Sequence, residues 1–248
     1  MIVTFIDNNT EYKADLSKGI EIGIPIQRGQ GVRSFDIDYA NYVTYQKDGF
    51  VGNKNHGGSC NLETITFTPH GNGTHTECFG HISIEENHVN KNIHDEFMMA
   101  QLFTASTNED ENRAILDFSK LVFVEPNNCK CLIVRTLPND NSKIERNYSG
   151  EKTPFISPQD MQMLVDVGIE HLVIDLPSVD PEWDEGKLLS HHIFWNYPDA
   201  PRTSCSITEF AYIPNEVLDG VYVLKLNIAH FVSDASPSRP IIYPLTKT

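Results

Sequence analysis

The chain has 248 residues, of which 40% are hydrophobic, so it can bury one substantial core, and its composition excludes collagen-like, low-complexity and wholly disordered proteins. Its formal net charge of −15, from 34 acidic and 19 basic residues, repels polyanions and excludes nucleic acid as the expected partner. A small substrate and a divalent cation fit this charge better.

Targeting signals and disulfide patterns are both missing from the sequence. Residues 1–12 have no basic run followed by an apolar core, and no window approaches 18 uninterrupted apolar residues. Five cysteines, an odd number, have no spacing typical of a disulfide framework. These features predict a cytoplasmic protein with reduced thiols and no membrane partner. No Pro/Ser/Gly-rich linker separates two patterned halves, so residues 1–248 are expected to form one domain.

The beginning of the chain is predicted to contain strands followed by long loops. Residues 2–16 are typical of strands around an Asn8-Asn9 turn, and residues 20–26 alternate apolar and polar side chains. These segments predict the start of an antiparallel sheet. Residues 27–60 are rich in Gly, Asn, Asp and Tyr without a helical period, which predicts long loops, placed over a site.

A strand then leads into a histidine-rich segment. Residues 63–68, ETITFT, alternate strictly and predict a half-buried strand. The segment PHGNGTHTECFGH follows at once, so its histidines are placed at the end of a strand. Gly71 and Gly73 can adopt positive φ, which lets the chain bend sharply and bring several side chains to one point.

The second half is predicted to be mostly strands with few helices. Residues 130–136, 171–176 and 221–228 are typical of strands, and the polar residues 139–153 of an exposed loop. A helix is predicted after the N-cap residue Ser157, because Pro158 and Asp160 occupy its first and third positions and Gly168 terminates it.

Three of the ten histidines, together with one acid, fall within twelve residues of one another in the histidine-rich segment. His70, His75 and Glu77 offer two imidazoles and a carboxylate, which suit a borderline divalent ion such as zinc or manganese. His75 and Glu77 lie two residues apart and face the same side if the segment is extended. A single histidine usually has an ordinary structural role, but the density of this cluster favours a metal site.

These residues resemble the signature H-x-G-T-H-x-D-x-P-x-H of the kynurenine formamidase and cyclase family. Three departures are visible: one extra residue separates His70 from His75, Glu77 replaces the usual Asp, and Cys78-Phe79 stands where the family often has Ala-Pro. The positions that match in order and spacing are Gly73, Thr74, His75, Glu77 and His81.

Later stretches extend the resemblance over most of the chain from residue 60 onward. Residues 175–180, DLPSVD, resemble the family's D-x-P-S-x-D run, and residues 189–191, LSH, resemble the place of another histidine ligand. Glu209 is the position most similar to a later family carboxylate, and residues 234–240, DASPSRP, follow near the C-terminus.

The resemblance implies a mixed, β-rich α/β fold of the swivelling β/β/α type, assembled as a homodimer or homotetramer. It implies an arylformamidase-like enzyme that cleaves a C–N amide bond of a small molecule and holds one or two divalent ions, Zn²⁺ or Mn²⁺. His81 would be the acid/base catalyst. The implied metal ligands are His70, His75, Glu77, His191 and Glu209.

Several alternatives stay open. Asp15-Leu16-Ser17 is not followed by the aromatic residue of formylkynurenine-specific members, so the substrate could instead be a cyclic amide, as for an isatin hydrolase. A protein that binds metal or a small carboxylate without turnover has no need of His81.

His192 competes with His191 as a ligand, and Asp180 is interpreted as a loop acid or cap. Arg239 could hold a substrate carboxylate or bridge subunits.

Overall fold

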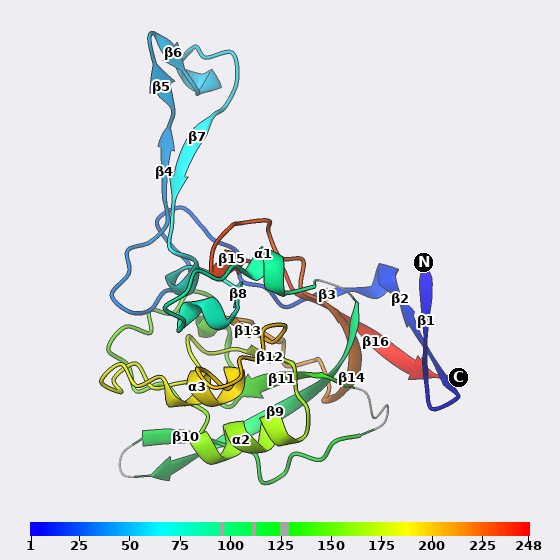
Figure 1. The fold of residues 1–248 in the computed structure, drawn as a ribbon. Helices are drawn as coiled ribbons and strands as arrows, with labels where there is room; N and C mark the ends of the chain where they lie inside the picture. The colour runs from blue at the N-terminus through cyan, green and yellow to red at the C-terminus, as the bar shows by residue number, and fades with distance from the viewer. Residues whose placement is uncertain (95–96, 111–112, 125–128) are drawn as a thin grey trace.

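The computed structural model describes residues 1–94, 97–110, 113–124 and 129–248, and its main feature is one large mixed sheet (Figure 1). The sheet contains β1 (Ile2–Asp7), β2 (Thr10–Asp15), β3 (Ile20–Glu21), β8 (His75–Glu77), β9 (Met98–Asp110), β10 (Arg113–Asp117), β11 (Cys131–Thr136), β12 (His171–Ile174), β13 (Ser206–Glu209), β14 (Gly220–Lys225), β15 (Ala235–Pro237) and β16 (Ile241–Lys247). Ten strands follow the order β1-β2-β16-β14-β9-β11-β12-β13-β8-β15, while β10 pairs with β9 and β3 with β16. The strand-rich mixed architecture confirms the predicted fold class.

The centre of the sheet is parallel and the outer strands are antiparallel. β9, β11, β12 and β13 are parallel neighbours, whereas β1 pairs with β2 in antiparallel fashion. All six residues of β11 are buried, as expected for a parallel strand covered on both faces. The antiparallel prediction for the N-terminal segments is therefore confirmed, because β2 and β3 also pair with β16 in antiparallel fashion.

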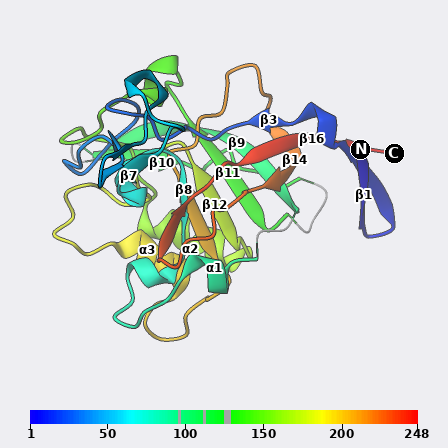
Figure 2. The same ribbon diagram turned by 90° about the horizontal axis from the view of Figure 1, so that it is seen from above.

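Two helices cover one face of this centre, α2 (Pro158–Asp166) and α3 (Leu189–Trp195), while the short α1 (Val89–Asn92) lies near β15 (Figures 1 and 2). Ser157 caps α2 by accepting a hydrogen bond from the backbone N–H of Asp160, as predicted. Met161 and Leu164 of α2 are buried in the core on this face. Burial of each such side chain contributes about 1.5–3 kcal/mol.

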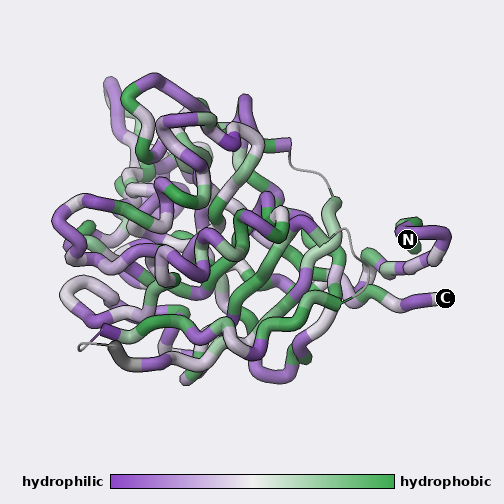
Figure 3. The backbone as a smooth tube through the Cα atoms, turned by 60° about the horizontal axis from the view of Figure 1, so that its bottom comes forward, coloured by the Kyte–Doolittle hydropathy of each residue, from purple (hydrophilic) through white to green (hydrophobic). Residues whose placement is uncertain are grey.

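A second apolar cluster covers the opposite face of the sheet. It includes Leu102, Ile133, Leu224 and Ile242, all almost completely buried. Figure 3 shows these apolar stretches running through the middle of the molecule. In the described part of the chain, no helix combines the length and apolar character needed to cross a bilayer.

The predicted strands agree with the structure to different extents. Residues 130–136, 171–176 and 221–228 correspond to β11, β12 and β14, with slightly different bounds. Asn8 and Asn9 have φ of 46° and 65° between β1 and β2, which confirms the predicted turn. In residues 20–26, only Ile20–Glu21 forms a strand, and Gly23 adds an isolated bridge to Ala211.

An arm formed by residues 41–66 projects from the sheet (Figure 1). It consists of β4 (Asn41–Thr44) paired with β7 (Glu63–Thr66), and of β5 (Gln46–Lys47) paired with β6 (Phe50–Val51). The prediction of loops is therefore wrong for residues 41–51. The predicted strand at residues 63–68 is confirmed as β7, but all four of its residues are exposed. Alternation identifies two different faces of a strand, and it cannot show that either face is covered within the same chain.

The predicted exposed loop at residues 139–153 contains deeply buried polar side chains. Lys143 and Tyr148 are 3% and 2% exposed. Lys143 Nζ donates hydrogen bonds to Asp175 Oδ2 at 2.7 Å and to the carbonyl oxygen of Thr136 at 2.8 Å. The prediction of exposure is wrong here because the ends of β11 and β12 supply buried oxygens that a lysine can satisfy.

Candidate metal centre

The histidine-rich segment folds as two 3₁₀ turns, at Pro69–Gly71 and Phe79–His81, on either side of β8. Gly73 has φ of 74°, and a Cβ there would lie 2.8 Å from Ile26 Cγ1, so a larger residue would clash. Thr74 anchors the segment. Its hydroxyl accepts a hydrogen bond from the N–H of Ile24 at 2.6 Å and donates one to the carbonyl oxygen of Phe210.

β8 lies between β13 and β15 and pairs with both in antiparallel fashion. The register places Glu209 opposite His75, so both side chains share one face of the sheet. Ala235 stands opposite Glu77, which brings the preceding residue, Asp234, to the edge of the same group. His75 and Glu77 are fully buried, and buried ionisable groups require partners.

Glu77 occupies the middle of a tight cluster. Its Oε2 lies 3.1 Å from His70 Nδ1, and its Oε1 lies 3.2 Å from His191 Nε2. His75 Nε2 lies 3.4 Å from Glu209 Oε2. The structure thus brings together all the predicted ligands and the predicted catalyst: His70, His75, Glu77, His81, His191 and Glu209.

The donor atoms of this cluster fit a divalent cation. His75, Glu77 and Glu209 each offer a ligand atom within 4.8 Å of the others, as do His70, Glu77 and His81. His75 Nε2 and Glu77 Oε2 are buried and make no hydrogen bond of good geometry in the described part of the molecule, although they lie 3.4 Å from Glu209 Oε2 and 3.1 Å from His70 Nδ1. Buried polar atoms with incomplete hydrogen bonding are costly, and a bound cation would satisfy both atoms. Both groups include Glu77, which places this carboxylate at the centre of the donor atoms.

Asp180 fixes the orientation of His191. Its Oδ2 lies 2.7 Å from His191 Nδ1, and its carboxylate also accepts hydrogen bonds from the backbone N–H groups of Ser190 and His191 at 2.9 and 3.0 Å. The prediction that Asp180 is a cap is confirmed. An imidazole held at Nδ1 by a carboxylate presents Nε2 as a ligand atom, as metal-binding histidines commonly do.

The carboxylates strongly favour positive charge in the cluster. Burial opposes charge on His191, but Asp180 and Glu77 outweigh it and raise the pKa of His191 to about 10. Burial also opposes charge on His70, and Asp234 and Glu77 raise its pKa to about 10. Burial alone would raise the pKa of Glu77, yet the surrounding histidines hold it well below its usual value. A divalent cation would supply the positive charge that these carboxylates stabilise.

His81 and Asp234 form the accessible side of the cluster. Their side chains are 28% and 33% exposed, and His81 Nδ1 lies 3.6 Å from Asp234 Oδ2. Asp234 Oδ2 also lies 2.8 Å from His70 Nε2. These histidines hold the pKa of Asp234 well below its usual value. Sequence reasoning did not assign a role to Asp234, although the DASPSRP run was visible, because its proximity to His70 depends on the pairing of β15 with β8.

Two other candidate residues lie outside the cluster. His192 Nδ1 hydrogen bonds with the carbonyl oxygen of Tyr197 at 3.1 Å, so His191 is the residue that reaches Glu77. These two histidines lie on a helix, where consecutive side chains diverge by about 100°. The structure does not bring Arg239 to the cluster: its guanidinium pairs with Glu21 at 2.7 and 2.9 Å and is 67% exposed.

Comparison with known families and structures gives consistent matches. The family model described as "putative cyclase" matches residues 14–181. A solved structure described as a potential metal-dependent hydrolase with cyclase activity is 14% identical, with a TM-score of 0.63, and the match covers 92% of this chain and 98% of that chain. Isatin hydrolase A from Labrenzia aggregata is 12% identical, with a TM-score of 0.63, over 91% of this chain and 93% of that chain.

A third similar structure is a predicted metal-dependent hydrolase from Bacillus stearothermophilus, 16% identical, with a TM-score of 0.61, covering 91% of this chain and 98% of that one. No curated protein matches the chain. At these identities, the structural matches show a shared fold over nearly the whole length.

Proposed function

Because the chain belongs to the cyclase family, we propose that it is a metal-dependent hydrolase that cleaves a C–N amide bond of a small molecule. The observation that carries this proposal is the meeting of buried donor atoms from His75, Glu77 and Glu209 within 4.8 Å of one another, two of which, His75 Nε2 and Glu77 Oε2, make no hydrogen bond of good geometry. The substrate class we propose is an aryl formamide, and the metal is Zn²⁺ or Mn²⁺, as one ion or two.

The residues of the cluster divide into ligands and a proton carrier. A divalent ion held by these ligands would supply Lewis acidity, which makes water a better nucleophile at neutral pH. Asp180 keeps His191 oriented toward Glu77. His81 takes a proton from the attacking water and delivers it to the leaving nitrogen. The ligands are His70, His75, Glu77, His191 and Glu209.

Two features of His81 support this role. Its side chain is 28% exposed, so a substrate can approach it, whereas Glu77 beside it is fully buried. Asp234 Oδ2 lies 3.6 Å from His81 Nδ1, where it stabilises the imidazolium that forms between the two proton transfers. His81 thus has both access to the substrate and a carboxylate beside it.

A cyclic amide is the second candidate substrate. Three of the similar structures are isatin hydrolases, and the matches cover 91%, 93% and 92% of this chain. Opening a cyclic amide uses the same water attack and the same proton transfer, but the amine and the carboxylate stay in one product molecule. Only the released product therefore distinguishes the two reactions.

The proposal is tested by assaying N-formylkynurenine, other aryl formamides and cyclic amides including isatin. Each assay is run before chelation, after chelation, and after Zn²⁺ or Mn²⁺ is restored. We expect turnover that chelation abolishes and metal restores. His192→Ala is the matched control, because this residue neighbours His191 but lies outside the cluster. Bound metal without turnover of any substrate would overturn the hydrolase and favour a binding protein.

A further inference from the structure

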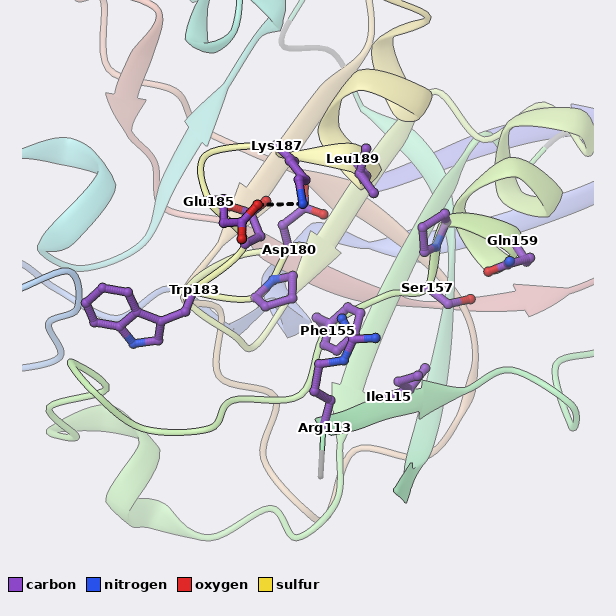
Figure 4. A pocket seen from close by; sticks show the side chains of 13 residues that line it. Arg113, Ile115, Phe155, Ser157, Gln159, Asp180, Trp183, Glu185, Lys187 and Leu189 are labelled. Atoms are coloured by element: carbon purple, nitrogen blue, oxygen red, sulfur yellow. Dashed lines mark ion pairs between the residues drawn. The ribbon is translucent and has the colours of Figure 1, made fainter. Parts of the chain in front are cut away.

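Two histidines of the metal cluster are held in different ways. His191 Nδ1 lies 2.7 Å from Asp180 Oδ2, so a carboxylate fixes the orientation of its imidazole. Asp180 reaches His191 from the wall of a cavity of about 520 Å³, where Figure 4 also shows Leu189, the first residue of α3. His75 Nδ1 has no carboxylate partner among the described residues and lies 3.3 Å from the carbonyl oxygen of Gly73. A hydrogen bond this long holds the imidazole of His75 only weakly.

The ring of Phe210 packs against the imidazole of His75. The centres of the two rings lie 5.9 Å apart, and the centre of the Tyr148 ring lies 6.0 Å from that of Phe210. Phe210 is 1% exposed and belongs to an apolar cluster with Ile24 and Val32. Aromatic pairs at such distances are favourable beyond the area that they bury. The packing around Phe210 therefore limits the rotation of the His75 imidazole.

A continued strand would not place this ring beside His75. Glu209 is the last residue of β13 and stands opposite His75 on one face of the sheet. Successive side chains of a strand alternate between the two faces, so an extended Phe210 would point to the other face. Phe210 instead has φ of 55°, a left-handed conformation that is rare and costly for a bulky residue. The left-handed backbone thus accounts for the contact between the two rings.

Hydrogen bonds on both sides hold Phe210 in this conformation. Its N–H donates to the carbonyl oxygen of Leu176 at 3.0 Å. Its carbonyl oxygen accepts a hydrogen bond from the hydroxyl of Thr74, the residue before His75. Both peptide groups next to Phe210 are therefore fixed. Strained backbone of this kind persists only where the surrounding structure determines it, and it is concentrated at functional sites.

We propose that Phe210 is a positioning residue of the metal centre. Its left-handed backbone places its ring against His75, and this contact keeps His75 Nε2 on the side of Glu209 Oε2, which lies at 3.4 Å. The inference rests on the metal centre of the proposed function and adds to it a residue that orients a ligand without binding the ion. Replacing residues that orient metal ligands typically lowers metal affinity by about 10–100-fold.

The role of the ring is tested by Phe210→Leu, with Phe118→Leu as the matched control. Phe118 is also buried and stacks on another ring, that of Phe103 at 5.9 Å, but it lies in the core cluster that contains Met161 and Leu164. The Zn²⁺ affinity of the full chain is measured by competition with a chromophoric chelator, and the visible absorption of bound Co²⁺ reports the geometry of the ligands. We expect Phe210→Leu to bind Zn²⁺ at least about tenfold more weakly and to change the Co²⁺ spectrum. Phe118→Leu should lose stability and change neither.

The role of the backbone is tested by comparing Phe210→Ile with Phe210→Leu. The two new side chains contain the same atoms, but branching at Cβ makes the left-handed conformation harder for isoleucine to adopt. We expect Phe210→Ile to bind Zn²⁺ several-fold more weakly than Phe210→Leu and to unfold at a lower denaturant concentration. Equal affinity and equal stability of the two variants would overturn the role of the backbone.

These measurements need no substrate, so they separate the positioning role from the proposed reaction. Zn²⁺ binding by Phe210→Leu as tight as that of the unaltered chain would overturn the positioning role and leave the proposed hydrolase in place. An equal loss of affinity in Phe118→Leu would have the same meaning, because the effect would then come from general destabilisation. An unaltered chain that binds no divalent ion would overturn the metal centre itself, and the positioning role with it.

Discussion

His81 is the most exposed histidine of the metal cluster, ahead of His70 at 21%. Its side chain is 28% exposed, while those of His75 and Glu77 are fully buried. A catalyst that exchanges protons with substrate needs access, whereas a ligand does not. We therefore expect His81→Ala to lower turnover by about 10²-fold or more and to keep its metal. We expect His75→Ala to lose metal, as measured by mass spectrometry.

These two outcomes separate the roles of the histidines. Full turnover by His81→Ala would remove this residue from the mechanism. Unchanged metal content in His75→Ala and in Glu77→Gln would show that the ligand assignment is wrong.

His171 links the stability of the protein to pH. Its Nδ1 lies 2.8 Å from Ser206 Oγ, and burial lowers its pKa to about 4 from a usual value of 6.5. At pH values between 4 and 6.5, the imidazole of His171 therefore binds a proton in the unfolded chain but not in the folded chain. His171 thus destabilises the fold as pH falls from 6.5 to 4. The effect reaches about 3 kcal/mol.

We expect His171→Gln, which cannot take up this proton, to lose less stability over that interval than the unaltered chain. The free energy of unfolding is measured in denaturant at several pH values. His56→Gln, at an exposed position, is the control and should follow the unaltered chain. Parallel curves for His171→Gln and the unaltered chain would contradict this assignment.

At the scale of elements, a buried ion pair links the segment after β11 to the residue that follows β12. Lys143 Nζ lies 2.7 Å from Asp175 Oδ2, and both side chains are almost fully buried. Burial raises the pKa of Asp175 despite the lysine. Removing one partner of such a pair leaves an uncompensated charge and costs about 3–5 kcal/mol.

Lys143→Met should therefore destabilise the fold by about that amount, as measured by denaturant unfolding. The double variant Lys143→Met with Asp175→Leu should recover much of the loss, because no charge is left buried. A single variant as stable as the unaltered chain would show that the pair is not buried as described.

Elements that begin with a local sequence signal were predicted well. Elements that depend on contacts distant in sequence were predicted poorly. Ser157, Pro158 and Asp160 define the start of α2 within four residues, so the sequence alone predicted it. The start of α3 has no such signal, since Leu188 precedes it with φ of 44° and no side-chain cap. The helix is stabilised instead by Asp180, ten residues earlier in the chain.

The candidate site shows the same limit. The spacing of His70, His75 and Glu77 could be interpreted because these residues are close in sequence. His191 and Glu209 were assigned only through the family resemblance, and Asp234 was not assigned at all. His191 meets Glu77, Glu209 meets His75 and Asp234 meets His70 through strand pairing or helix packing that no local pattern specifies.

At the scale of the whole molecule, the arm has little to pack against. Val43 and Ile65 are 52% and 48% exposed, on opposite faces of the β4–β7 pair. An isolated two-stranded ribbon is only marginally stable in water. We expect the arm to be covered by another copy of the chain in a homodimer or homotetramer, the assembly proposed from the family resemblance.

We expect Ile65→Asp to lower the molar mass measured by light scattering toward that of a single chain. Gln46→Asp, exposed in the same arm, adds the same charge without removing an apolar side chain and should leave the mass unchanged. A monomeric unaltered chain at micromolar concentration would contradict the expectation.

The position of β8 between β13 and β15 has a consequence for biosynthesis. The residues around Glu77 come from segments as far apart as residues 70 and 234, so the cluster cannot assemble while the C-terminal part of the chain is still being translated. Domains ordinarily begin to fold as they emerge from the ribosome. An ion held by this cluster would be captured only after β13, which carries Glu209, has paired with β8, and its capture would then add to the stability of the finished fold.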